Sequence, residues 1–403
     1  MKILFVTWDG PQVTYLESLF LPIFVRLAEH GISFQILQFT WADSERIALA
    51  RQGCEKAGVG YQAIPIWRRP RAMGAMLTAI AGARHVKKAV KEHRIDAVMA
   101  RSTLPALASM LALRGTQCPL VFDADGLPLD ERVDFAGQSP SGLMHRLLRD
   151  VEAQAVRRAD VVLTRSAKAI EILHARAGAS TPLEKFHLVS NGRDANLFKP
   201  ADATERVEMR RTLGLAADAP LVIYAGSLGP QYCIDEMLCL FSYIKIRRQD
   251  AHLLILTGSP DAMQPALAKH PQVDGSVTVL TVSARDVSKY LGCSDLGLAL
   301  RQPSFSMQAV APIKLGEYLL CGLPVAATAC IGDTQAISAD AGVLLQRMDA
   351  VELKSAADWF VDSVIPQREL FRSKSRAVGL AHFSLEASAA SYKSALQNFN
   401  ISL

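Results

Sequence analysis

Short runs of apolar residues alternate with longer amphipathic stretches through most of this chain. The apolar runs are bounded by turn-forming residues, whereas the stretches between them repeat their apolar positions at helical spacing. This alternation predicts parallel β-strands that are connected by helices. In the first half, strands are expected at 2–7, 33–39, 61–64, 96–100, 119–122, 160–164 and 186–189. In the second half, they are expected at 221–225, 252–257, 276–280, 295–300, 324–327 and 343–345.

A polar break separates the two series of strands. Segment 191–200 reads NGRDANLFKP, and a charge-rich helix is expected just after it, at 204–213. Because 403 residues exceed a comfortable single core, we expect two domains, 1–198 and 199–383, with a final helix at about 384–403 that packs back on the first. Each domain should be a doubly wound, Rossmann-like α/β sheet, and the strand carboxyl ends of both should face a central cleft.

Composition narrows the class of protein. Apolar residues make up 50% and charged residues 21% of the chain, which is typical of a globular protein. There is no apolar run of membrane-spanning length and no signal-peptide cleavage pattern near the amino terminus, so a cytoplasmic location is expected. The seven cysteines are scattered without the spacing of a zinc site, so no metal site is expected.

Segment 311–325, APIKLGEYLLCGLPV, carries the clearest chemistry. Pro312 is expected in the first turn of a helix, and Gly322 is expected to end it before a buried strand. Free N–H groups and the dipole at such a helix start favour phosphate, Lys314 adds a positive charge, and Glu317 lies on nearly the same face. The segment therefore predicts a nucleoside-diphosphate site in which Glu317 binds the ribose diol. An ordinary capped helix with an exposed Lys–Glu pair is the alternative.

The same segment is similar to part of a known family. Its order Pro-x-Lys-x-x-Glu-Tyr, followed by Cys-Gly-x-Pro-Val, resembles the donor-site motif of retaining glycosyltransferases with the GT-B fold, in family 4, or glycosyl transferases group 1. Three other segments resemble this family in the expected order: 191–200, and the glycine turns in 224–228 and 256–259. The resemblance implies a metal-independent enzyme of the hexosyltransferase type, as used in polysaccharide biosynthesis. It would move a sugar from a nucleotide-diphosphate sugar to a hydroxyl of a glycan or lipid-linked acceptor, with retention.

The resemblance also implies roles for individual residues. The second domain would hold the donor, which is a substrate, so that no separate cofactor is needed; the first would hold the acceptor. The donor-binding residues would be Gly226, Ser227, Gly258, Arg301, Lys314, Leu315 and Glu317. The chain departs from the family at Ser227, Tyr232 and Ala309, where two basic residues and a glutamate are common. Lys314 is therefore the best catalytic cation to oppose the leaving diphosphate. Arg301 is a second candidate, or a solvated loop cation.

A second candidate site follows the apolar run at 119–122, in the sequence Asp123-Ala124-Asp125-Gly126. Counting from this strand puts Asp125 where the family often has a histidine near the acceptor. We predict Asp125 as a catalytic residue that accepts a proton from the hydroxyl or orients it. Two alternatives stay open: a metal-binding Asp-x-Asp triplet, and an Asp-Gly turn with an N-capping aspartate. Asp9 and Tyr15, after the first strand, either contact acceptor or form a simple turn.

Residues 65–95 form a basic element with the single acid Glu92. Its basic residues are Arg68, Arg69, Arg71, Arg84, Lys87, Lys88, Lys91 and Arg94. Apolar residues at helical spacing predict an amphipathic helix here. This helix would lie on an anionic membrane surface, as a peripheral protein on the inner face of the cell membrane, or pack its apolar stripe inward. Nucleic acid is not an expected partner, because no binding motif accompanies the charge.

Two other functions compete with transfer. A nucleotide-sugar epimerase would turn over the donor without any acceptor. A non-catalytic sugar-nucleotide-binding subunit would bind nucleotide without turnover, and the departures at Ser227, Tyr232 and Ala309 favour it. An NAD enzyme is disfavoured because no Gly-x-Gly-x-x-Gly follows the first strand.

Overall fold

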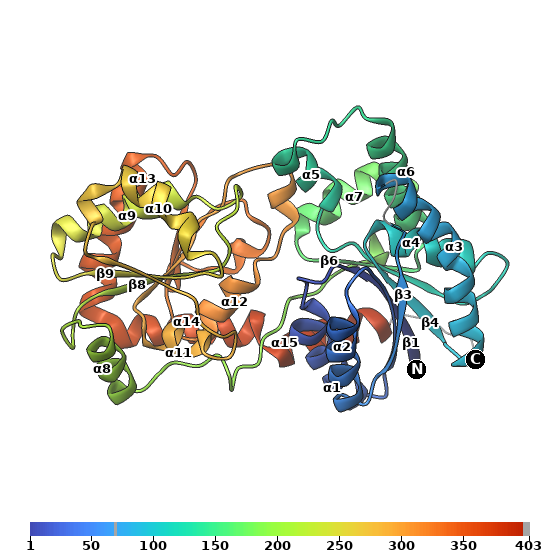
Figure 1. Ribbon diagram of the computed structural model, residues 1–403, viewed down its shortest axis with the longest axis horizontal. Helices are drawn as coiled ribbons and strands as arrows, with labels where there is room; N and C mark the ends of the chain where they lie inside the picture. Colours follow the sequence, from blue (N-terminus) through green and yellow to red (C-terminus); the bar gives the residue numbers. More distant parts are fainter. Residues whose placement is uncertain (68–70, 398–403) are drawn as a thin grey trace. The chain divides into compact units, whose positions relative to one another are not determined.

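The structure is a computed structural model that describes residues 1–67 and 71–397. The chain divides into two compact units (Figure 1). The first unit contains Met1–Ser190, Gln308–Val310 and the described chain from Ser388 on, and the second contains Asn191–Met307 and Ala311–Ala387. We expected the division after residue 198, but Phe198 is only 2% exposed and lies in the core of the second unit. The second unit therefore starts at Asn191.

The first unit is a parallel sheet with strand order β3-β2-β1-β4-β5-β6-β7. Its strands are β1 (Lys2–Asp9), β2 (Ser33–Thr40), β3 (Gly60–Pro65), β4 (Ala97–Arg101), β5 (Leu120–Asp123), β6 (Val161–Thr164) and β7 (Phe186–Leu188). Its helices are α1 (Leu21–Ala28), α2 (Ser44–Lys56), α3 (Arg71–Glu92), α4 (Thr103–Ala112), α5 (Pro128–Ala136), α6 (Leu143–Arg158) and α7 (Ala167–Ala177). A further helix, α15 (Leu385–Gln397), joins this unit from far along the chain.

The second unit is a parallel sheet with strand order β10-β9-β8-β11-β12-β13. Its strands are β8 (Leu221–Ala225), β9 (His252–Leu256), β10 (Val277–Leu280), β11 (Leu296–Ala299), β12 (Val325–Thr328) and β13 (Gly342–Leu345). Its helices are α8 (Ala203–Thr212), α9 (Ile234–Arg247), α10 (Gln264–Lys269), α11 (Val287–Cys293), α12 (Ile313–Leu320), α13 (Ala350–Trp359) and α14 (Arg368–Phe383). Helices cover both faces of the sheet (Figure 1), which explains why its strands are almost continuously apolar.

The predicted doubly wound α/β architecture is confirmed, and every predicted strand overlaps an observed one. The prediction for the start of α12 is wrong in one detail. Pro312 is the residue before the helix, with φ −66° and ψ 112°, and not part of its first turn. Its extended ψ places the helix start at Ile313, and Lys314 is thus the second helical residue. Gly322, with φ 74°, ends the segment as expected.

Strand order reverses once in each sheet, and this locates the candidate sites. The reversal falls between β1 and β4 in the first unit and between β8 and β11 in the second. At such a point the connections leave in opposite directions and open a crevice beyond the strand carboxyl ends. Side chains that follow these four strands are therefore the first to consider as ligand contacts.

The two halves of helix α3 differ in burial. Its second half packs inward, with Val86 and Ala89 at 0% and 3% exposure. In its first half, Met73, Leu77 and Ile80 are 58%, 49% and 49% exposed. Arg68 and Arg69 lie outside the described residues, as does the side chain of Arg71. Four exposed residues form what we call the basic face of α3: Arg84, Lys87, Lys88 and Lys91.

Membrane contact by this helix stays a prediction. Within residues 1–67 and 71–397, no helix combines the length and the apolar composition that crossing a bilayer requires.

Candidate functional site

Lys314 lies against the glycine turn that follows β8. Its Nζ atom donates a hydrogen bond of 3.0 Å to Tyr224 Oη, and Tyr224 Oη in turn donates to the Ser227 carbonyl oxygen. A Cβ atom on Gly226 would lie 2.6 Å from Lys314 Nζ, and Gly226 has a φ of 150°. Only glycine permits this close approach without strain. The structure thus brings together three of the predicted donor-site residues, Gly226, Ser227 and Lys314.

Arg301 joins this group because β11 is the neighbour of β8. Lys314 Nζ lies 4.2 Å from the ring centroid of Tyr232, and the Arg301 guanidinium carbon lies 4.9 Å from the same centroid. Neither cation has a carboxylate ion-pair partner among the described residues. Burial, together with the positive charge of Arg301, holds the pKa of Lys314 well below its ordinary value of 10.5. Two basic side chains that lie close together, without a carboxylate ion-pair partner among the described residues, favour an anion.

Glu317 is placed one helical turn beyond Lys314, but it is already paired. Its Oε1 atom lies 2.7 Å from Nη2 of Arg193, and both side chains are 15% exposed. Burial raises the pKa of Glu317, and the charge of Arg193 opposes that rise. The Arg193 guanidinium also lies 5.0 Å from the ring of Phe198. Sequence analysis missed Arg193, although it occupies the variable position of the Asn-Gly-x-Asp pattern.

The two other predicted donor-site residues lie apart from this group. The side chain of Leu315 is fully buried in the core, and its N–H donates to the Pro312 carbonyl, so neither the side chain nor the N–H is available to a ligand. Gly258 is exposed in the turn after β9, at the same carboxyl edge as Gly226 but one strand away.

Asp333, which sequence analysis also missed, lies in the turn after β12. Its Oδ1 atom is buried without a hydrogen-bond partner among the described residues. Burial raises the pKa of Asp333 to about 8, while the charge of Arg301 opposes the rise. The raised pKa favours the protonated carboxyl, which can donate a hydrogen bond.

In the first unit, Arg101 links the ends of β1 and β5. Its Nη1 atom lies 3.4 Å from Asp9 Oδ1, and its Nη2 atom lies 2.5 Å from Asp125 Oδ2. Asp9 Oδ2 also accepts hydrogen bonds from Thr7 at 2.7 Å and Gln38 at 3.0 Å. Partial burial raises the pKa of Asp125, against the opposing charge of Arg101. Asp9 and Asp125 are thus held at the β1–β4 reversal by one buried guanidinium.

The two aspartates of the Asp-x-Asp sequence have separate partners. Asp123 is fully buried and accepts from Arg165 at 3.0 Å, and Arg165 donates to the hydroxyl of Tyr392 on α15. Among the described residues, no three or more His, Cys, Asp or Glu side chains are grouped so that they could hold a metal ion. The N-capping alternative for Asp125 is wrong, because Leu127 is the N-cap of α5 and no side chain caps it. Positive φ values of 51° and 82° at Asp125 and Gly126 form a tight turn instead.

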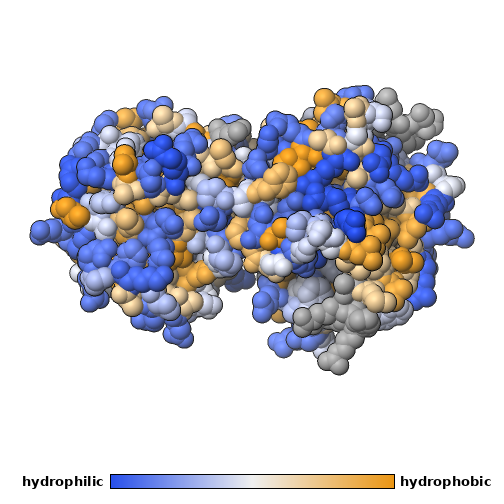
Figure 2. Space-filling model, turned by 90° about the horizontal axis from the view of Figure 1, so that it is seen from above, coloured by the Kyte–Doolittle hydropathy of each residue, from blue (hydrophilic) through white to orange (hydrophobic). Residues whose placement is uncertain are grey.

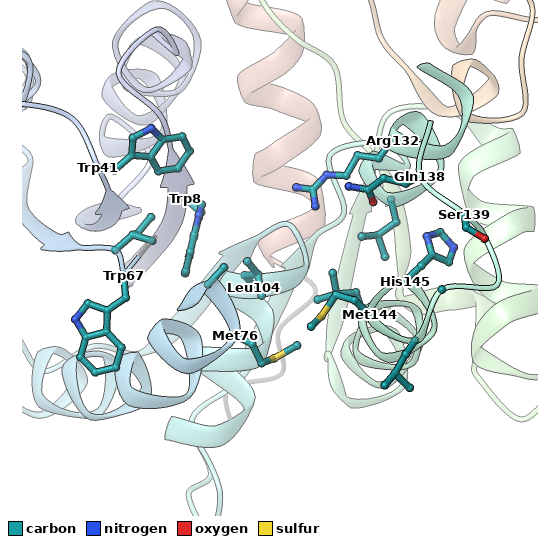
Figure 3. Close-up of a pocket in the computed structure, with 16 residues that line it drawn as sticks. Trp8, Trp41, Trp67, Met76, Leu104, Arg132, Gln138, Ser139, Met144 and His145 are labelled. Carbon is teal, nitrogen blue, oxygen red and sulfur yellow. The ribbon is translucent and has the colours of Figure 1, made fainter. Parts of the chain in front are cut away.

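A cavity of about 570 Å³ opens within the first unit. Trp8, Trp41 and Trp67 form one wall, and Arg132 and His145 lie on the other (Figure 3). The three tryptophans come at or just after the ends of β1, β2 and β3, which are neighbours in the sheet. Sequence analysis missed this cavity. The signal was a tryptophan at the carboxyl end of each of three consecutive predicted strands.

Two family models match the chain. Residues 20–192 match "Glycosyl transferase 4-like domain" and residues 219–363 match "Glycosyl transferases group 1", together more than three quarters of the chain. A D-inositol 3-phosphate glycosyltransferase of Xylanimonas cellulosilytica is 27% identical over 68% of this chain and 66% of its own length. One of the same name from Jonesia denitrificans is 26% identical over 60% of this chain and 58% of its own length. The chain thus spans less than two thirds of either relative.

Solved structures share the fold across nearly the whole chain. Anabaena Alr3699/HepE, solved in complex with UDP, superposes with a TM-score of 0.73 at 16% identity, over 99% of this chain and 100% of that one. WaaG, a glycosyltransferase involved in lipopolysaccharide biosynthesis, gives a TM-score of 0.67 at 18% identity, over 99% and 100% of the two chains. A putative UDP-N-acetylglucosamine 2-epimerase from Listeria monocytogenes gives a TM-score of 0.56 at 16% identity, over 98% of this chain and 94% of that one.

Proposed function

Since the chain belongs to the group 1 glycosyltransferases with the GT-B fold, we propose that it moves a sugar from a nucleotide-diphosphate sugar to a hydroxyl of a glycan or lipid-linked acceptor, with retention. The observation that carries this proposal is the pair of cations, Lys314 and Arg301, beside the Gly226 turn. The pair lies at the strand reversal of the second sheet, where a phosphate group is best placed to meet both charges.

Loss of the nucleoside diphosphate places negative charge on its phosphate oxygens as the bond to the sugar breaks. Lys314 and Arg301 can oppose that charge directly, so the leaving group can be stabilised without a metal ion. Their mutual repulsion in the free protein falls when an anion binds between them. The donor-complexed structures of Alr3699/HepE, with UDP and with UDP-glucose, support a nucleotide-sugar donor for this chain as well.

Glu317 is proposed to bind the ribose diol. Its ion pair with Arg193 means that ribose must either share the carboxylate with that guanidinium or replace it. A carboxylate already held by an arginine is oriented before the ligand arrives, which lowers the entropy cost of binding.

Asp125 is proposed to act on the acceptor hydroxyl. Arg101 fixes the carboxylate from one side, at 2.5 Å, and leaves the side chain 34% exposed. A carboxylate with this exposure can accept a hydrogen bond from an incoming hydroxyl and orient it for attack. In a retaining reaction, the departing phosphate is a further acceptor for the proton, so Asp125 need not carry it alone.

A non-catalytic nucleotide-sugar-binding subunit is the second candidate function. The observation in its favour is Tyr232, whose ring contacts both cations at a position where the family resemblance leads us to expect a basic residue. The epimerase alternative rests on a shared fold alone.

Thermal unfolding in the presence of UDP, GDP, ADP, TDP and CDP tests the proposal first. A nucleotide at about 100 times its dissociation constant stabilises the folded state by roughly 2.7 kcal/mol. The sugar donor of the stabilising nucleotide is then incubated with and without lipid-linked and glycan acceptors. Diphosphate release that requires an acceptor supports transfer. An isomerised donor without acceptor indicates an epimerase, and stabilisation without turnover indicates a binding subunit.

We further propose peripheral association with an anionic membrane surface through α3. Exposed Met73, Leu77 and Ile80 lie on the same helix as its basic face. A combination of apolar and basic residues on one helix is what binding to anionic lipid requires.

A further inference from the structure

The cavity between the three tryptophans and α6 has the chemistry of a site for an apolar ligand. Trp8, Trp41 and Trp67 face Leu104 and Met144, while polar groups are few and lie to one side (Figure 3). Its volume of about 570 Å³ falls within the usual range for ligand sites, which are mostly apolar with a few oriented polar groups. A ligand that fills it must therefore be largely hydrocarbon.

The cavity also has one unpaired positive charge. Arg132 lines both this cavity and an adjoining one of about 480 Å³, which extends to Gly10 and Ser102. Within the described residues its guanidinium has no ion-pair partner. Ser102 directly follows Arg101, the residue that holds Asp125. The adjoining cavity thus connects the apolar cavity to the end of β4, where the acceptor hydroxyl is proposed to react.

On its other side, the cavity continues towards the surface. Met76 lines both the tryptophan cavity and a groove of about 430 Å³ that Ile80, Leu111 and Leu147 also line. Ile80 and Leu147 are 49% and 44% exposed. In Figure 2, which views the molecule from above, hydrophobic patches gather among hydrophilic residues on this unit. Met76 therefore lies between the cavity and a mostly apolar groove at the exposed part of α3.

We propose that this cavity binds the hydrocarbon chain of an amphiphilic acceptor whose anionic headgroup meets Arg132. The proposal rests on the function proposed above and narrows its acceptor to the lipid-linked class. Charge complementarity selects an anionic headgroup, and the apolar walls select the chain. A glycan in the same place would find hydrogen-bond partners only on the side of Arg132, Gln138, Ser139 and His145, and its hydroxyl groups against leucine and methionine side chains would have none, which is costly.

Binding of farnesyl phosphate, measured by quenching of intrinsic tryptophan fluorescence, tests this without any turnover. Geranyl phosphate and isopentenyl phosphate provide a series of shorter chains, and farnesol, inorganic phosphate and maltotriose are the controls. Each buried methylene strengthens binding roughly fourfold, so farnesyl phosphate should bind at least about 100-fold more tightly than isopentenyl phosphate. Inorganic phosphate and maltotriose should not displace it.

Three variants locate the binding. Ala75→Phe fills the cavity and Leu104→Glu places a charge on its wall, and each should weaken farnesyl phosphate binding at least tenfold. Arg132→Gln should weaken farnesyl phosphate about tenfold and leave farnesol unchanged. Leu183→Glu is the matched control, because Leu183 is 57% exposed in the same unit and lines neither cavity. Thermal unfolding and nucleotide binding of every variant show whether the fold has survived.

Three results would overturn the proposal. The affinity for the alkyl phosphates could be independent of chain length, farnesyl phosphate could bind Ala75→Phe as tightly as wild type, or maltotriose could displace farnesyl phosphate. Because the cavity lies in the first unit and the proposed nucleotide site in the second, the two hypotheses fail separately. If the protein binds farnesyl phosphate but no nucleotide, the proposed transfer is contradicted and the proposal of a hydrocarbon site is retained. The reverse result would contradict only the hydrocarbon site.

Discussion

Replacing Lys314 by methionine removes the charge of the proposed diphosphate site while keeping most of the side-chain volume. If Lys314 contacts phosphate, the variant loses a charge-assisted hydrogen bond of roughly 1.5–3 kcal/mol, and nucleoside-diphosphate affinity falls about 10- to 150-fold. Lys289→Met is the matched control, because Lys289 is 70% exposed in the same unit and pairs with nearby Asp286. It should bind nucleotide as the wild type does.

The depressed pKa of Lys314 adds a second consequence. In the free protein burial disfavours its ammonium form, whereas a bound diphosphate favours that form. Nucleotide binding should therefore take up as much as about one proton at a pH between the depressed pKa of Lys314 in the free protein and its higher pKa in the complex, and Lys314→Met should lack this uptake. Titration calorimetry in two buffers with different ionisation enthalpies measures this uptake.

Lys314→Met should weaken nucleotide binding but increase the stability of the folded state relative to wild type. A folded-state pKa below the ordinary value of 10.5 means that the unfolded chain binds more protons between these two pKa values, so wild-type stability falls as pH falls from 10.5 towards the depressed pKa and levels off below it. Lys314→Met lacks this loss, and its melting temperature should rise relative to wild type at lower pH. Unchanged nucleotide affinity, or equal proton uptake by both proteins, would refute the reasoning.

Four further predictions follow from the other residues. Asp125→Asn should lower turnover by about 10²–10⁴ and leave donor affinity nearly unchanged, whereas a purely structural turn would keep turnover within a few-fold of wild type. Wild type should bind a nucleotide more tightly than its 2′-deoxy analogue, and Glu317→Gln should abolish that preference; equal binding of both nucleotides by wild type would contradict the ribose role. Asp333→Asn should melt above wild type by a margin that grows as pH rises towards about 8, because a raised pKa means that the carboxyl stabilises the fold only while protonated, and parallel melting curves would contradict this. Charge reversal across the basic face of α3 should abolish flotation with anionic liposomes and spare activity on a short soluble acceptor; flotation insensitive to salt would contradict it.

The strands were predictable because the information that specifies them is local. Each is a short apolar run bounded by turn residues, and burial on both faces makes the run continuous. The Lys314 and Gly226 motifs were predictable for the same reason. The contacts that complete the sites were not, because they join residues far apart in the chain. The ion pairs Arg193–Glu317 and Arg101–Asp125 can be predicted only once the arrangement of the strands is known.

The tryptophan cavity shows the same limit in a milder form. The three tryptophans stand out only when β1, β2 and β3 are known to be neighbours, which the sequence implies but does not state. Ala309 is harder to anticipate. Its segment, Gln308–Val310, belongs to the first unit although the chain on both sides of it belongs to the second. No local pattern marks that exchange.

Helix α15 also crosses between units, and this has a consequence for how the protein is made. Tyr392 is fully buried in the first unit, where its hydroxyl accepts from Arg165, and Ser388 donates to the Ser190 carbonyl at 2.6 Å. These partners come after the whole second unit in the chain. During synthesis on the ribosome, the first unit therefore cannot complete its packing until the second unit has emerged, because the hydrogen bond from Arg165 to Tyr392 forms only after α15 has been made. A chimaera that exchanges the second unit between relatives must keep α15 with the first unit, on which it packs.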